Sequence, residues 1–315
     1  MKYTPRLLER RIPEPSVSAT TTHDNIKWRD LHLAFLGCEA NPPYGPYDHT
    51  ANLFLELLSR SISESGRNGR GNIGIHLRIS IFETSKGHFP DSIDQYHGVI
   101  LPGSFSSAYD QDSWILDLSK FIQSQLIPAA KPTLGVCFGH QILAQSYLGN
   151  GGAAIKCPAG PQAGRKTFQS TPVGRSIFGE NSLDLLYTHG DMVESLPPTA
   201  LSLGGNSSVP IESAIYFATP QQLQQFQLSA STMDSEMNTM VKPIAITFQA
   251  HPEYAHPELG LQQTLNKIVD AMQDRNDITK EEQLRAKVDA KERFASVQQQ
   301  SINAMIRAGK LLGWF

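Results

Sequence analysis

The chain has 315 residues, a formal net charge of -3 and 40% hydrophobic residues, enough for one large core with additions to a typical single domain. This charge gives no electrostatic basis for binding nucleic acid or an anionic membrane, and no long apolar stretch or signal-peptide core predicts membrane spanning or secretion. Three cysteines, Cys38, Cys137 and Cys157, form neither an even disulfide framework nor a paired metal spacing. We therefore expect a cytoplasmic protein without a metal, the nucleus not being excluded.

The first half of the chain alternates predicted strands and helices. Residues 1–27, rich in Thr, Pro and charge, are expected to form a mobile N-terminal arm. The elements that follow are strands over 31–36, 75–82 and 98–101, helices over about 50–60 and 113–126, and a strand from Thr133. Strand and helix in succession favour an α/β fold with a doubly wound, mostly parallel sheet.

The second half adds smaller elements to this domain, which we place over residues 28–275. Short strands and turns between 153 and 217 predict a small antiparallel addition. The Gln-, Ser- and Met-rich insertion 220–242 is either a lid or partner-binding element or a disordered loop. Residues 276–315 are charged and helix-forming, and this helical C-terminal extension either packs back on the domain or serves as a dimer helix.

The motif G-x-C-x-G surrounds Cys137, with Gly135 and Gly139 two positions away on either side. An apolar strand that turns sharply into a helix through such a motif is the cysteine form of a nucleophile elbow. The elbow places the sulfur at a helix N-terminus, where free N–H groups and the helix dipole favour a thiolate. The alternative is a buried structural cysteine at the end of a core strand.

A cysteine nucleophile needs a base, which usually lies far away in sequence. The apolar run 243–248 reads as a strand, and His251 and Glu253 follow its end, where open α/β sheets keep their active sites. Glu253 could accept the hydrogen bond that fixes the tautomer of His251. His140 also competes, but a lone C-x-x-H is weak for a metal, and His256 with its proline reads as the start of a helix to about Asp274.

Four segments together carry a resemblance to a known family. The sequences GVCFGHQ, QAHPEY, LPGS and THGD stand in the order and contexts found in class I glutamine amidotransferase domains, over about residues 31–260. The run LPGSFSSAYDQDSWILDL is most similar to the free-standing branch that includes gamma-glutamyl peptidases and GMP-synthase-like amidotransferase domains. The resemblance implies a flavodoxin-like fold and a Cys-His-Glu triad of Cys137, His251 and Glu253.

The resemblance also implies roles for residues beside the triad. The oxyanion donors would be the backbone N–H groups of Gly103 and Phe138. The residues that would hold the alpha-amino-acid end of the substrate are Gln141, Thr188, Gly190 and Asp191. The sequence departs from the family at Ser104, which replaces a second glycine, and at Ala250, which replaces a common aromatic residue.

The function implied is that of a cysteine hydrolase that cleaves a gamma-glutamyl amide bond through a gamma-glutamyl thioester on Cys137. The substrate would be glutamine, glutathione or a gamma-glutamyl conjugate, and no cofactor is required. Two alternatives stay open: a glutaminase subunit that supplies ammonia to a separate synthetase partner, and a catalytically silent regulatory homologue. The sequence does not identify the leaving group.

Overall fold

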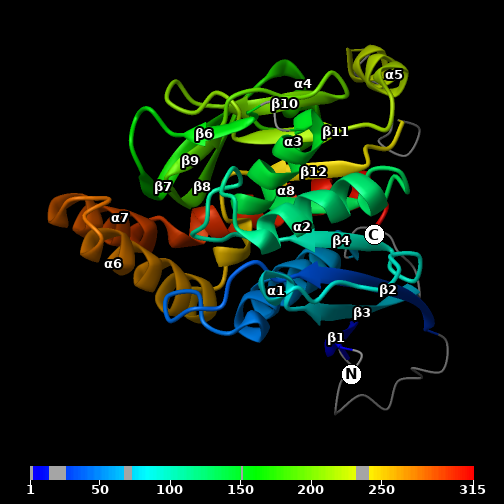
Figure 1. The fold of residues 1–315 in the computed structure, drawn as a ribbon, viewed down its shortest axis with the longest axis horizontal. Coiled ribbons are helices and arrows are strands. Elements are labelled where there is room, and N and C mark those ends of the chain that lie inside the picture. The colour runs from blue at the N-terminus through cyan, green and yellow to red at the C-terminus, as the bar shows by residue number, and fades with distance from the viewer. Residues whose placement is uncertain (1–2, 14–25, 67–72, 150–151, 232–240) are drawn as a thin grey trace.

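The computed structural model describes residues 3–13, 26–66, 73–149, 152–231 and 241–315. Ten strands of these segments form one twisted sheet in the order β1-β3-β2-β4-β5-β12-β11-β10-β7-β8, and β6 and β9 form a separate pair (Figure 1). The strands of the large sheet are β1 (Arg6–Ile12), β2 (Lys27–Leu36), β3 (Ile73–Phe82), β4 (Gly98–Leu101), β5 (Thr133–Val136), β7 (Gln162–Ser170), β8 (Ser182–His189), β10 (Ala200–Gly205), β11 (Ser213–Tyr216) and β12 (Ala245–Phe248).

Five parallel strands, β3, β2, β4, β5 and β12, form the centre of the sheet. The short strands β4, β5 and β12 are buried along their whole length, as parallel strands covered on both faces should be. Val136 at the end of β5 lies opposite Phe248 at the end of β12. The residues that follow these two strands therefore emerge side by side at one edge of the sheet.

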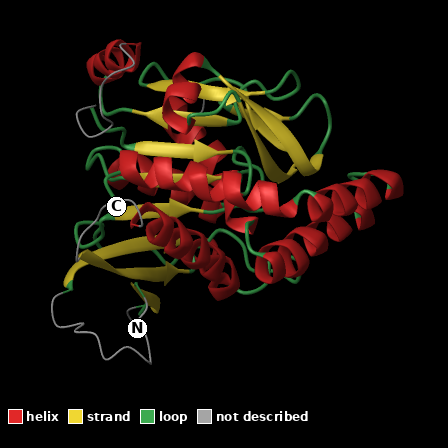
Figure 2. Cartoon of the chain, turned by 180° about the vertical axis from the view of Figure 1, so that it is seen from behind, coloured by secondary structure: helices red, strands yellow, loops and turns green. Residues whose placement is uncertain are grey.

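Helices cover both broad faces of the sheet (Figures 1 and 2). Alternate residues of β2 separate the two cores: Leu33 and Phe35 pack with α1 (Tyr47–Gly66) and α8 (Phe294–Leu311). Ala34 and Leu36 pack on the other side with α2 (Ser113–Phe121) and α3 (Phe138–Leu148). The predicted doubly wound α/β fold is confirmed.

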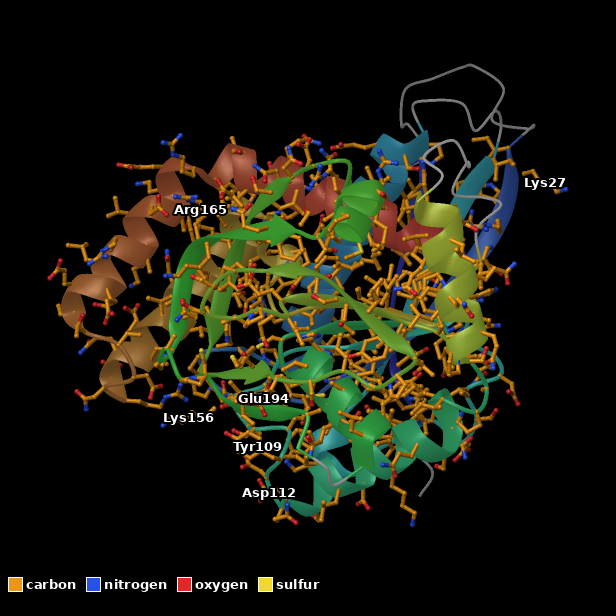
Figure 3. The ribbon with its side chains drawn as sticks, turned by 90° about the horizontal axis from the view of Figure 1, so that it is seen from above. Lys27, Tyr109, Asp112, Lys156, Arg165 and Glu194 are labelled. Carbon is orange, nitrogen blue, oxygen red and sulfur yellow. The ribbon has the colours of Figure 1, made fainter. Side chains whose placement is uncertain are left out.

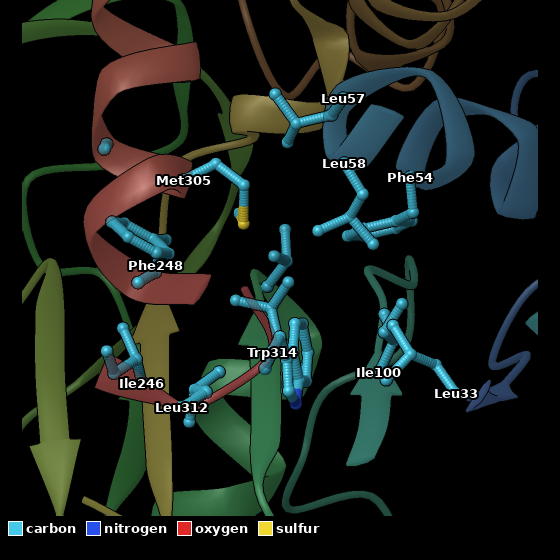
Figure 4. Close-up of a cluster of buried hydrophobic side chains, with 14 of the residues drawn as sticks. Leu33, Phe54, Leu57, Leu58, Ile100, Ile246, Phe248, Met305, Leu312 and Trp314 are labelled. Carbon is cyan, nitrogen blue, oxygen red and sulfur yellow. The ribbon is translucent and has the colours of Figure 1, made fainter. Parts of the chain in front are cut away.

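The C-terminal extension packs back on the domain. Met305, Leu312 and Trp314 are buried against the same core as Phe248 and Leu58 (Figure 4). Before α8, the extension contains α7 (Lys280–Glu292), which begins with a capping box at Thr279. With α6 (Asn266–Asp274), α7 forms a helical hairpin that projects from one side of the molecule (Figure 1).

The predicted small antiparallel addition is present, since β6 pairs with β9 in a separate antiparallel sheet and β11, β10, β7 and β8 extend the main sheet with antiparallel strands. Two segments differ from the sequence-based expectations. Arg6–Ile12, expected to belong to a mobile arm, pairs with β3 as an antiparallel edge strand; residues 1–2 and 14–25 lie outside the described residues. Part of the insertion 220–242 is the helix α5 (Pro220–Ser231), and residues 232–240 are not described.

Short elements complete the chain. They are β6 (Ala154–Lys156), β9 (Asp191–Val193), α4 (Pro172–Phe178), a π-helical turn at Ile122–Leu126 that continues α2, and a π-helical segment at Pro257–Leu265 that leads into α6. The His256 side chain caps that segment by accepting from the amides of Glu258 and Leu259, and the helix ends at Asp274 as expected. Among the described helices, none is long and apolar enough to cross a membrane.

Candidate active site

Cys137 lies in the sharp turn between β5 and α3 and adopts φ 52° and ψ -109°, a conformation that L-residues rarely take. Its amide donates a 2.8 Å hydrogen bond to the carbonyl of Phe248, which ties the turn to the end of β12. Such backbone strain costs about 1–3 kcal/mol and persists where the surrounding structure holds it. The motif read from the sequence thus has the geometry of a nucleophile elbow.

The two glycines of the motif are required by close backbone contacts. A Cβ atom placed on Gly139 would lie 2.0 Å from the carbonyl oxygen of Leu101, and one on Gly135 would lie 2.7 Å from the carbonyl oxygen of Gly139. Helix α3 therefore begins directly against β4 and β5. This contact brings Cys137 close to the loop that follows β4.

Gly139→Ala should destabilise the protein. In an ordinary helix this change stabilises by about 1 kcal/mol, but here the added methyl group meets backbone that cannot move away freely. We expect the free energy of unfolding to fall by about 1–3 kcal/mol, measured by urea denaturation. Gly190→Ala is the matched control, because a Cβ there has no atom within 4 Å. Equal stability of both variants would contradict the packing described for the elbow.

A 3₁₀ turn, Pro252–Tyr254, follows shortly after β12. His251 is the residue just before this turn, and Glu253 is the middle residue of the turn. Nδ1 of His251 and Oε1 of Glu253 are 2.7 Å apart, and both side chains are fully buried. The imidazole stacks on the ring of Tyr254, with 4.2 Å between centroids and 5° between planes. A carboxylate and an aromatic ring thus hold the imidazole in one orientation.

Gly103 shows that His251 and Cys137 face the same small space. A Cβ atom placed on Gly103 would lie 3.0 Å from Cε1 of His251 and 3.5 Å from Cβ of Cys137. The loop after β4, the elbow after β5 and the turn after β12 therefore converge. The Gly103 amide has no hydrogen-bond partner among the described residues, and the Phe138 amide stands at the first position of α3, where no carbonyl of the same helix can accept it.

The charge balance at His251 favours the imidazolium. Burial alone lowers the pKa of His251, but the negative charge of Glu253, the charge of Cys137 and hydrogen bonds to both outweigh it and raise the pKa to about 10. The hydroxyl of Thr188 lies 3.0 Å from Nε2 of the same ring. Thr188 thus contacts the imidazole through its side chain, besides standing in the segment expected to meet the substrate.

A cavity of about 390 Å³ opens beside Cys137. Gln141, Thr188, Gly190 and Asp191 all line it, as does the buried His189. The side-chain Nε2 of Gln141 donates to the backbone carbonyl of Asp191 at 3.0 Å and to Oε1 of Gln249 at 3.1 Å. All four residues expected to hold the substrate therefore lie at one cavity, next to the sulfur.

The other histidines near the site are placed for structural roles. His140 is buried, with Nδ1 2.7 Å from the hydroxyl of Thr247 and Nε2 3.2 Å from the carbonyl of Ile211. Burial lowers the pKa of His140 to about 4 and that of His189 to about 3, so both are neutral at pH 7. Among the described residues, no group of His, Cys, Asp and Glu side chains has the arrangement of a metal site.

The family model described as glutamine amidotransferase class-I matches residues 61–271, more than half of the chain. The chain belongs to the class I glutamine amidotransferases. The matched range contains the elbow, the turn with His251 and all the residues expected at the substrate. Among solved structures, a glutamine amidotransferase from Thermotoga maritima superposes with a TM-score of 0.59 over 90% of this chain and 98% of that one, at 14% identity, which shows the shared fold.

Relatives of this amidotransferase come from several lineages. A glutamine amidotransferase-like protein of Schizosaccharomyces pombe is 28% identical, over 72% of this chain and 80% of its own length. Gamma-glutamyl peptidase 4 of Arabidopsis thaliana is 32% identical, over 51% of this chain and 68% of the peptidase. A glutamine-hydrolyzing GMP synthase of Bacteroides fragilis is 28% identical, over 58% of this chain and 30% of the synthase.

Several residues of the amidotransferase site were not predicted from the sequence. The carboxylate of Glu39 accepts hydrogen bonds from the hydroxyl of Ser104 and the amide of Phe105, and so orders the loop after Gly103. The serine that departs from the family pattern thus has a partner of its own. A Glu three residues after a strand carries no signal of this role, since the contact depends on a loop 65 residues away.

The sequence did not indicate the polar side chains that hold Asp191 in the cavity. Asp191 accepts hydrogen bonds from Ser107 at 2.5 Å and from Tyr109 at 3.0 Å, so its carboxylate is held by the loop after β4. Lys156 lines the same cavity and lies on the same side of the molecule as Tyr109 (Figure 3). Across the opening, the guanidinium of Arg275 lies 4.2 Å from the ring centroid of Phe105.

Proposed function

We propose that this amidotransferase is a cysteine hydrolase that cleaves a gamma-glutamyl amide bond through a thioester on Cys137. The convergence of His251 and the free amide of Gly103 on Cys137, which lines a 390 Å³ cavity, carries this proposal. The strained elbow supports it further, because strain of this kind is concentrated at functional sites. The similarity to a gamma-glutamyl peptidase favours the same bond.

The first step is attack of the Cys137 sulfur on the gamma-carbonyl carbon. The carbon–sulfur bond forms while the carbonyl electron pair moves to oxygen. The amides of Gly103 and Phe138 donate to that oxygen, and each stabilises it by roughly 3 kcal/mol if it behaves as other oxyanion donors do. Helix α3 adds the positive end of its dipole at the same place.

The second step needs a proton for the departing amine, and His251 supplies it. With a pKa of about 10, the imidazole is protonated before the substrate arrives, and Glu253 keeps its ring in place through Nδ1. The carbon–nitrogen bond then breaks and a gamma-glutamyl thioester remains. His251, now neutral, takes a proton from the water that hydrolyses the thioester.

The alpha-amino-acid end of the substrate would occupy the inner part of the cavity. Gln141 offers an amide fixed by two hydrogen bonds, and Gly190 leaves its backbone accessible because nothing lies within 4 Å of its Cβ direction. Thr188 and Asp191 complete this part. The chemistry requires a free thiol at Cys137, which a reducing compartment such as the cytosol preserves.

Glu253→Gln should move the alkaline limb of the pH profile. The wild-type kcat/KM should fall as pH rises through about 10, where His251 loses the proton it donates. The negative charge of Glu253 raises the pKa of His251. Removing that charge therefore lowers the pKa and shifts the fall in kcat/KM to lower pH. A pH profile of glutamate release measures this shift, with Glu258→Gln as the control because Glu258 is exposed on the following segment. An unmoved limb in Glu253→Gln would mean that Glu253 does not act on His251.

The proposed function is tested by glutamate release from a panel of donors: glutamine, gamma-glutamyl dipeptides, glutathione and a glutathione conjugate. We expect at least one donor to yield glutamate with the purified protein alone. Donors with the amide on the alpha-carboxyl should be inert, because the cavity residues expected to bind the substrate would then face the wrong end. If no gamma-glutamyl donor releases glutamate, the proposal is wrong.

A second candidate is a glutaminase subunit that delivers ammonia to a separate synthetase. The similarity to a glutamine-hydrolyzing GMP synthase favours it. Under this reading glutamine is the donor, and its slow hydrolysis rises when an extract containing the partner is added. Fast hydrolysis of a dipeptide donor by the pure protein, unchanged by extract, decides for the peptidase.

A further inference from the structure

Tyr44 has a buried hydroxyl without a hydrogen-bond partner among the described residues. The residue lies in the loop between β2 and α1 and is 2% exposed. The loop is rigidly closed, since the amide of Gly45 donates to the carbonyl of Asn41 at 2.7 Å and the amide of Tyr44 donates to Oδ1 of Asn41. The tyrosine ring packs edge-on against Phe105 with 4.9 Å between centroids. Its hydroxyl is therefore held in a fixed place.

That place is the reacting centre. A Cβ atom placed on Gly103 would lie 3.4 Å from Oη of Tyr44, next to 3.0 Å from Cε1 of His251 and 3.5 Å from Cβ of Cys137. The phenol oxygen thus stands beside the residue whose amide we assign to the oxyanion. The hydroxyl faces the same space as the sulfur and the imidazole.

The hydroxyl can only donate usefully there. Burial raises the pKa of Tyr44, and the negative charges of Cys137 and Glu39 raise it further. Tyr44 therefore keeps its proton at any pH at which the protein would work. A buried hydroxyl that lacks a partner costs stability, so its place beside the reacting centre calls for an explanation.

We propose that Tyr44 donates a third hydrogen bond to the oxyanion formed on the gamma-carbonyl oxygen. This inference rests on the proposed function. As sulfur bonds to carbon, the carbonyl electron pair moves to oxygen, and the phenol O–H hydrogen-bonds that oxygen without giving up its proton. The bond exists only in the tetrahedral state and so lowers the barrier without tightening substrate binding.

The test compares two reactions of the same sulfur in Tyr44→Phe. Release of p-nitroaniline from gamma-glutamyl p-nitroanilide passes through an oxyanion, whereas alkylation of Cys137 by iodoacetamide does not. We expect kcat/KM for the first to fall about 100-fold through kcat, with KM little changed. The alkylation rate should stay unchanged, which also shows that the variant is folded.

Tyr216→Phe is the matched control. Tyr216 is fully buried in β11, and within the described residues its hydroxyl makes no hydrogen bond of standard geometry. Its ring packs against Tyr147, and it lies opposite Ala245, at the end of β12 away from the elbow. Tyr254 is unsuitable, because its ring stacks on His251. Tyr216→Phe should leave both rates unchanged. Tyr44→Phe should unfold at or above the wild-type temperature, since it loses an unpaired buried hydroxyl.

The other results would overturn the inference. An unchanged kcat/KM in Tyr44→Phe means that the hydroxyl has no part in the reaction. An equal fall in both rates means that Tyr44 acts on the sulfur rather than on the oxyanion. If p-nitroaniline release does not require Cys137, tested with Cys137→Ala in the same assay, the proposed function itself fails and this inference with it.

Discussion

Cys137→Ala should abolish glutamate release from the true donor. Loss of a nucleophile that forms a covalent intermediate lowers kcat by roughly 10⁶-fold in comparable hydrolases. The fold should persist, because the side chain that is removed is small and alanine retains the Cβ atom. Release of glutamate is followed by a coupled assay, and unfolding by denaturant. Full activity in this variant would show that the sulfur does not react. In the wild-type protein, a Cys137 that does not react with thiol reagents would favour the catalytically silent alternative.

Cys137→Gly separates the chemical role from the strain. Both substitutions remove the sulfur, but only glycine adopts φ 52° without steric cost. The release of about 1–3 kcal/mol of strain is partly offset by the larger chain entropy of glycine. We expect Cys137→Gly to be about 1 kcal/mol more stable than Cys137→Ala. If the alanine variant is the more stable one, the elbow is not strained.

His251→Asn should trap the thioester. Without the imidazole, turnover of an amide donor should fall by roughly 10⁶-fold, as for loss of the base in comparable hydrolases. A p-nitroanilide leaves as a weak base and needs less proton assistance, so acylation should survive better than hydrolysis. Mass spectrometry of the intact protein should then show one glutamyl group on Cys137.

His256→Asn is the control for that experiment, since the same substitution there alters only a helix cap. It should turn over the p-nitroanilide as the wild type does and accumulate no adduct. An adduct on another residue, or trapping by both variants alike, would contradict the role of His251.

The central parallel strands could be predicted from the sequence because their signals are local. Residues 98–101 form a strand with the expected bounds. The elbow and the turn with His251 are each marked by a sequence motif of only a few residues. Adjacent strands in one register then bring these two turns together. The prediction needed no knowledge of distant contacts beyond the rule that active sites lie at strand ends.

The missed features are those that only tertiary contacts reveal. Arg6–Ile12 carries four charges in seven residues, which reads as a solvated arm, yet charged side chains are also what protects an exposed edge strand. Glu39 and Tyr44 reach the site from a loop that follows β2, and they contact residues some sixty positions away. No periodicity or motif marks them.

The connection between α6 and α7 gives the cavity a wall beyond the residues that the family model matches. Arg275 and Asp277, in the connection between the two helices, line the cavity beyond residue 271, where the family match ends. Under the proposed function, part of the surroundings of the departing amine would come from this connection. A change of sequence there would alter those surroundings without touching the elbow.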